Sequence, residues 1–261
     1  MEDSRNKYKK DVLRLATFLG QVMLANGAET SRIQDTVKRV CASRGFNHVN
    51  VFLAPSTIIV SDDRFDGYTF MKIIENRVIN LSRVDKLNQF SRKFVDNPDI
   101  CIEEAILELK GLETSSPYSP IISNIATAIG SSSFAVLAGG NDMKTFILTL
   151  ITAIIANVVY DIVMKESKIP VFATIVASVI ISISGAMLTE IEILDTPKML
   201  IVGSIMPLLP GVPFIKGIRD LISGELMSGV GRAIDAAMIA MAIAAGVGLV
   251  MNHYIRMGGV L

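Results

Sequence analysis

A break in the distribution of charge constrains this chain more than any other feature. Residues 1–113 carry most of its Lys, Arg, Asp and Glu, whereas long stretches after Ser115 carry none. Charged side chains are costly inside a bilayer, so uncharged apolar stretches of about 20 residues indicate membrane-spanning helices. The mean hydropathy of +0.49 agrees with this division. The sequence therefore predicts a membrane protein, with a small cytosolic α+β domain over residues 1–114 and an all-α transmembrane domain over residues 115–261.

The N-terminal region mixes the periodicities of helices and strands. Apolar residues recur at helical spacing over residues 4–25 and again from Ser31, which forms a capping-box pattern with Gln34. Alternating β-branched residues then indicate short strands, and helical spacing returns after them. The pattern predicts three strands, at 49–53, 57–60 and 68–74. It then predicts two further helices, at 82–95 and 99–109.

The C-terminal region contains about five apolar segments of membrane-spanning length. The predicted spans are 119–139, 145–164, 170–189, 199–215 and 232–251. Basic residues near the span ends favour a cytosolic N-terminus and an outside C-terminus, because cytoplasmic loops are enriched in Lys and Arg. No signal peptide is expected at the charged N-terminus. These features predict a multi-pass protein of the cytoplasmic membrane.

Several classes of function lack the residues they need. The net charge of zero gives no reason to expect nucleic-acid binding. No P-loop or nucleophile-elbow motif is present, so we expect neither an ATP site, nor another cofactor, nor an enzyme. His48 and His253 are the only histidines and lie far apart, so no metal site is expected. Cys41 and Cys101 are expected to be free thiols.

The fourth span is interrupted by prolines. Pro207, Pro210 and Pro213 lie close together around Gly211, and each proline removes a donor from the helical hydrogen-bond ladder. Interrupted backbone at membrane depth is tolerated inside protein or along a wet cavity, and discontinuous helices form substrate sites in secondary transporters. The break therefore predicts either a substrate site or a helix that is merely kinked.

Polar and ionisable residues near the spans are the other candidates for a substrate or ion pathway. Such groups usually face the bundle interior or a water path, although residues at span ends can also reach the membrane surface. Residues three or four apart share a helix face, so Asn157 and Asp161 lie on one face, and Arg232 could pair with Asp235. The candidates are Asn157 with Asp161, Arg219 with Asp220, and Arg232 with Asp235. The polar segment 216–224 is expected to be re-entrant or cytosolic.

Two groups of motifs resemble the threonine/serine exporter family. The first comprises Leu24-Ala25-Asn26-Gly27-Ala28-Glu29-Thr30-Ser31-Arg32 and Pro55-Ser56-Thr57-Ile58. The second comprises Pro210-Gly211-Val212-Pro213, Arg219-Asp220-Leu221-Ile222-Ser223-Gly224, Ser228-Gly229 and Arg232. The resemblance covers nearly the whole chain in order.

This resemblance implies export of small polar metabolites, such as threonine, serine or a dicarboxylate like succinate. Long members of the family have ten spans, and in others the membrane region is split between two proteins. The chain resembles the larger, N-terminal partner, which implies a smaller multi-span partner or self-association. Two alternatives stay open: a membrane-anchored cytosolic sensor or enzyme domain without a transport pathway, and an assembly subunit.

The first motif has two interpretations of its own. It could be a tight turn with a local pair between Glu29 and Arg32. It could instead be a gate or docking element that meets the membrane half. The residues in question are Asn26, Gly27, Glu29, Thr30 and Arg32.

Overall fold

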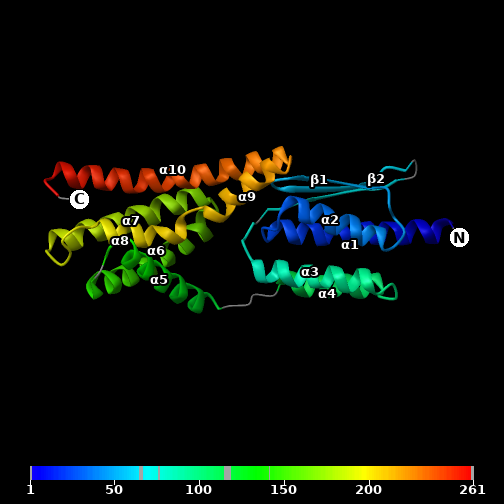
Figure 1. The fold of residues 1–261 in the computed structure, drawn as a ribbon, viewed down its shortest axis with the longest axis horizontal. Coiled ribbons are helices and arrows are strands. Elements are labelled where there is room, and N and C mark those ends of the chain that lie inside the picture. Colours follow the sequence, from blue (N-terminus) through cyan, green and yellow to red (C-terminus); the bar gives the residue numbers. More distant parts are fainter. Residues whose placement is uncertain (1, 65–66, 76, 115–118, 141, 260–261) are drawn as a thin grey trace. The chain divides into compact units, whose positions relative to one another are not determined.

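The computed structural model is mostly helical, with one small sheet (Figure 1). It describes residues 2–64, 67–75, 77–114, 119–140 and 142–259. The chain forms two compact units: unit 1 contains residues 1–117 and 215–233, and unit 2 contains residues 118–214 and 234–261. Unit 1 thus includes a segment from far along the chain. The predicted division between domains falls beside residues 115–118, and the predicted outside C-terminus is Leu261, both beyond the described residues.

Two helices open unit 1. Helix α1 (Glu2–Ala25) and helix α2 (Thr30–Ala42) are joined by a short loop in which Gly27 has φ +80°, a conformation that favours glycine. The predicted capping box is wrong: Glu29 is the N-cap residue of α2 and no side chain caps that end. Ser31 lies inside the helix instead.

The sheet of unit 1 has three antiparallel strands in the order β1-β2-β3. Strands β1 (Val49–Ala54) and β2 (Thr57–Asp62) form a hairpin, and β3 (Thr69–Ile73) pairs with β2. The three predicted strands are therefore confirmed, with bounds shifted by one or two residues. Ile58, Val60 and Asp62 alternate with less buried neighbours along β2, so one face of the sheet is turned to the core.

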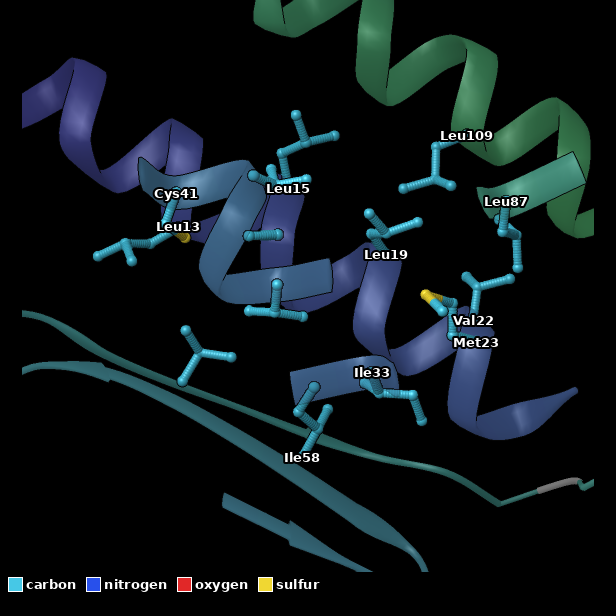
Figure 2. Close-up of a cluster of buried hydrophobic side chains, with 14 of the residues drawn as sticks. Leu13, Leu15, Leu19, Val22, Met23, Ile33, Cys41, Ile58, Leu87 and Leu109 are labelled. Atoms are coloured by element: carbon cyan, nitrogen blue, oxygen red, sulfur yellow. The ribbon is translucent and has the colours of Figure 1, made fainter. Parts of the chain in front are cut away.

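That core is built mainly from α1. Figure 2 shows Leu15, Leu19 and Met23 of α1 near Ile33 of α2, with Ile58 on the sheet side. Helices α3 (Leu81–Asp96) and α4 (Ile102–Thr114) add Leu87 and Leu109. Each fully buried aliphatic side chain contributes roughly 1.5–3 kcal/mol of hydrophobic stabilisation. Both cysteines are free, as expected, and burial raises the pKa of the Cys41 thiol to about 12.

One buried carboxylate lies on the inner face of the sheet. Asp62 is 2.8 Å from Lys9 Nζ and 2.6 Å from Arg64 Nη2. Burial alone would raise the pKa of this carboxyl, but hydrogen bonds from Arg64 and Lys9 outweigh it and hold the pKa well below its usual range. This cluster pins the N-terminal half of α1 to the end of β2.

Unit 2 is a bundle whose helices are small and polar inside and apolar outside. Its helices are α5 (Pro120–Leu137), α6 (Met143–Ser167), α7 (Pro170–Glu190), α8 (Lys198–Ile205), the 3-10 turn η1 (Met206–Leu208) and most of α10 (Leu226–Arg256). On α6 the buried residues are Thr145, Thr149, Thr152, Ala153 and Ala156. The opposite face exposes Ile147, Ile151 and Ile155. This polarity is typical of helices packed together in lipid.

Four helices, α5, α6, α7 and α10, are long and apolar enough to cross a membrane. A fifth candidate span is a pair, residues 198–208 and α9 (Gly211–Ile222), bent by 53°. The number of predicted spans is thus matched if the pair counts as one. The last helix starts at Leu226, six residues before the predicted bound. Its first turns are more polar than a membrane span, but their backbone groups still form helical hydrogen bonds.

Candidate functional site

The α1–α2 loop and the polar end of α9 contact each other within unit 1. Gly27 turns its carbonyl oxygen toward Lys216, whose Nζ donates a hydrogen bond to it. One residue later, the Ala28 carbonyl accepts a hydrogen bond of 3.1 Å from Arg232 Nη2. Two cations are therefore bound by main-chain oxygens of a turn whose shape depends on the positive φ of Gly27.

The next loop residue forms an ion pair at the surface. Arg219 Nη1 lies 2.7 Å from Glu29 Oε1, with side-chain exposures of 64% and 25%. The local pair of Glu29 with Arg32 that the sequence allowed is not what the structure shows for Glu29. Arg32 is exposed on α2. Because both side chains are partly exposed to solvent, the Glu29–Arg219 pair orients the two segments but contributes little to the free energy of unfolding.

A buried cluster of three residues completes the contact. The Thr30 hydroxyl donates a hydrogen bond of 3.0 Å to Asp220 Oδ2, and Arg232 Nε lies 3.4 Å from the same oxygen. Thr30 and Asp220 are 0% and 2% exposed, and Arg232 is 9% exposed. A buried carboxylate needs both a counter-charge and hydrogen bonds, and here a cation and a hydroxyl supply them.

Contacts on either side extend this junction. Gln34 donates to Glu225 at 2.9 Å, and the Ser228 hydroxyl donates to the Leu53 carbonyl at 3.2 Å. Gly231 lies against Pro55 so closely that a Cβ there would be 2.2 Å from the proline Cγ. The β1–β2 turn thus packs on the start of α10. We call the contacts of residues 27–34 and 53–55 with residues 216–232 the polar junction.

The polar junction unites the two groups of motifs found in the sequence. Asn26 supports the loop from inside: its Nδ2 donates to the Val22 carbonyl and its Oδ1 accepts from Arg83. Sequence reasoning named Arg219, Asp220 and Arg232 as candidates. It also named Glu29 and Thr30 as part of a possible docking element, but it did not pair the two groups, which lie about 190 residues apart along the chain. It also missed Lys216, Gln34 and Ser228 as members. The pairing of residues on different elements has no local signal.

Chemically, the acidic and basic side chains that form the polar junction pair with one another or with polar groups of the facing segment, as far as the structure describes them. Every group described above in it has a hydrogen-bond or ionic partner. Such an arrangement holds the α9–α10 turn to the α1–α2 loop. These contacts could form or break as the α9–α10 turn moves against the α1–α2 loop. Breaking them costs free energy because it would separate the buried Asp220–Arg232 pair.

The prolines of the fourth span end one helix and start the next. Pro207 lies in η1, which follows α8, and Leu209 is extended with ψ 129°. Helix α9 begins at Gly211, so Pro213 lies in its first turn, where a missing N–H is tolerated. A Cβ at Gly211 would meet no atom within 4 Å.

The remaining candidates lie apart from one another. Asn157 is half-buried on α6 and its Nδ2 has no hydrogen-bond partner, while Asp161 is exposed one turn further on. The sequence left open whether Asp161 faces a water path or reaches the membrane surface, and its exposure is compatible with either interpretation. Asp235 is exposed on α10, and Arg232 pairs with Asp220. Among the described residues, no three His, Cys, Asp or Glu side chains gather closely enough to hold a metal ion.

Comparison with known proteins places the chain in a family. The model of the family described as "Putative threonine/serine exporter" matches residues 14–254, nearly the whole chain. The chain belongs to the threonine/serine exporter family. The resemblance read from the motifs is thereby confirmed. No solved structure matches the chain.

Its curated relatives within the family come in two lengths. The "Probable succinate transporter subunit YjjP" of Klebsiella aerogenes is 23% identical over 94% of this chain and 95% of its own length. The protein of the same name in Escherichia coli is 21% identical, over 93% and 94%. The "Threonine/serine exporter" of Corynebacterium glutamicum is 25% identical over 91% of this chain but only 50% of its own length. The chain thus spans about half of some relatives and nearly all of others.

Proposed function

We propose that this chain is a subunit of a secondary transporter that exports small polar metabolites across the cytoplasmic membrane. Threonine, serine and a dicarboxylate such as succinate are the candidate solutes, since the relatives' names refer to them. The observation that carries the proposal is the inside-out bundle of unit 2 with its broken helix pair. Helices of this kind bury small polar residues and present aliphatic ones outward.

The subunit composition is part of the proposal. One relative of similar length is named a subunit, and another is about twice as long. A second multi-span protein of the family, or a second copy of this chain, would supply the missing half. If a five-span half is followed by a second such half, the two insert with opposite orientation, as in inverted-repeat transporters.

The proposed topology places residues 1–114 in the cytosol and the C-terminus outside. The excess of Lys and Arg in the loops that this orientation makes cytoplasmic supports it. A gradient of an ion or of the solute would drive export. Asp161, Arg219, Asp220 and the break at Pro207–Pro213 stay the candidate elements of the pathway.

Flux in proteoliposomes tests the proposal. The purified chain is reconstituted into vesicles, alone and with the candidate partner. The vesicles are loaded with labelled succinate, L-threonine or L-serine, and efflux is measured with and without a pH gradient. We expect efflux that requires the partner or a self-associated form. Absence of efflux in every combination contradicts transport and favours the membrane-anchored sensor or enzyme alternative.

Three variants locate the pathway in the same assay. Asp161→Asn should weaken coupling to a pH gradient, and Arg219→Ala should lower flux at unchanged expression. Gly211→Leu should block flux by filling the space at the break. A Cβ at Gly211 would meet no atom within 4 Å, so this variant should still fold. Wild-type flux in all three would place the path elsewhere in the assembly.

A further inference from the structure

Buried hydroxyl groups in unit 2 differ in whether they have a hydrogen-bond partner. Most Ser and Thr side chains in its helices donate to the carbonyl four residues earlier, as Ser132, Thr174 and Ser182 do. This is the usual way for a helix to satisfy a hydroxyl. Thr149, Ser178 and Ser204 are equally buried, at 0%, 0% and 3% exposed, yet their oxygens have no hydrogen-bond partner.

The unpartnered hydroxyl of α8 faces α6. Gly203 packs on α5, where a Cβ would lie 2.5 Å from Ala135 Cβ, and Ile201 packs on Gly185 of α7. With about 100° between successive residues of a helix, Ser204 falls on the arc between these two directions. That arc contacts α6, because α6 packs against α5, α7 and α8.

Thr149 lies opposite Ser204 at a similar depth. Helices α6 and α8 run parallel, and Thr145 and Met199 meet at their starts, both against Gly140. At about 1.5 Å per residue, Thr149 lies roughly 6 Å and Ser204 roughly 7.5 Å beyond that level. Both hydroxyls therefore occupy one layer of the α6–α8 contact, without bonding to each other.

The series continues toward the break. Ser178 of α7 is not part of this layer, because its Cβ would lie 2.8 Å from a Cβ at Gly246 of α10. Asn157 lies roughly 18 Å beyond Thr145, near the depth at which η1 ends. Its unpartnered atom, Nδ2, can only donate a hydrogen bond. Thr149, Ser204 and Asn157 thus lie at successive depths along α6 and α8.

We propose that Thr149 and Ser204 bind a carboxylate group of the transported solute, with Asn157 receiving it at the break. This inference rests on the proposed transport function. A carboxylate offers about four acceptor positions, which matches a set of donors, whereas an amide nitrogen cannot ligate a metal cation. The site is covered in this structure, so a solute reaches it when α8 moves away from α6.

Binding and stability of the full-length chain in nanodiscs test the site together. The probes are labelled succinate and L-threonine, with L-threonine amide as the probe without a carboxylate. Thr149→Val and Ser204→Ala should each weaken carboxylate binding about tenfold or more, because hydrogen bonds to charged groups are the strong ones. The amide should be unaffected. The melting temperature without solute should stay or rise, because an unpaired buried hydroxyl is removed.

Ser132→Ala and Thr174→Val are the matched controls, since these buried hydroxyls are already bonded within their helices. They should leave the affinity unchanged. Wild-type binding that Thr149→Val and Ser204→Ala do not alter would overturn the site and leave the transport proposal standing. No binding of either carboxylate by the wild-type chain, in a preparation that melts cooperatively, would overturn the site and count against transport.

Discussion

Asp220 gives the sharpest prediction about the polar junction. Asp220→Asn keeps the shape of the side chain but removes its charge, so Arg232 at 9% exposure keeps only the Ala28 carbonyl among the contacts described. Breaking a buried ion pair by removing one partner costs about 3–5 kcal/mol. The Thr30 hydroxyl adds a hydrogen bond to a charged acceptor, so Thr30→Val should cost about 1.5–3 kcal/mol.

The free energy of unfolding can be measured in mild detergent by pulse proteolysis across a urea series. Because Thr30 and Arg232 bind the same oxygen, the Asp220→Asn and Thr30→Val costs should not add, and the double variant reports their coupling. Asp35→Asn is the control: its pair with Arg39 is 3.7 Å long and exposed, so the loss should stay near 0.5 kcal/mol or less. Equal losses for Asp220→Asn and Asp35→Asn would refute the reasoning.

Three other predictions follow from the structure. The pKa of Asp62 is lowered in the folded state, so this carboxyl contributes stability that is present above its unfolded-state pKa of about 3.9 and is lost as the pH falls from there through the folded-state pKa. The unfolding free energy should therefore fall progressively below about pH 5, most steeply below about pH 4, and Asp62→Asn should flatten that slope. Glu29→Arg and Arg219→Glu should each cost less than about 1 kcal/mol, and the double swap should restore part of it in the same unfolding assay. Gly203→Ala should lose about 1–3 kcal/mol, since its Cβ would lie 2.7 Å from the Ser131 carbonyl oxygen, whereas Gly130→Ala, with open space, should gain up to about 1 kcal/mol; comparable melting temperatures would contradict this.

Local patterns predicted the elements of this fold well. The strands, the break in the fourth span and the helices of both regions follow from periodicity and proline chemistry, which act over a few residues. The capping box failed because α2 begins one residue before Ser31, with Glu29 as its N-cap, and Gln34 bonds to Glu225, a partner that no local pattern reveals. The start of α10 was predicted too late because its first turns are polar and were not counted as part of a membrane span. These turns belong to unit 1, where polar residues do not prevent a helix.

The candidate site was predicted only in part, for the same reason. Asp220 and Arg232 stand out in sequence as charges beside apolar spans, but their contact with Thr30 joins segments about 190 residues apart. Thr149 was missed although the spacing of Thr145, Thr149 and Thr152 marks one helix face. That signal was available. Whether a hydroxyl on that face bonds to its own helix depends on rotamer and packing, which the sequence does not specify.

The length of α10 sets how the chain can lie in a bilayer. Residues 236–252 of this helix carry no charged side chain, and they cover about 25 Å at about 1.5 Å per residue. The hydrocarbon core is about 30 Å thick, so the uncharged segment has no surplus length to tilt. Arg232 and Asp235 bound it at one end, and His253 and Arg256 at the other. A thicker membrane must therefore thin locally around this helix or draw its flanking charges inward, and Arg232, the residue that neutralises Asp220, is one of these charges. Lipid chain length is thus expected to act on the polar junction without any change in the protein.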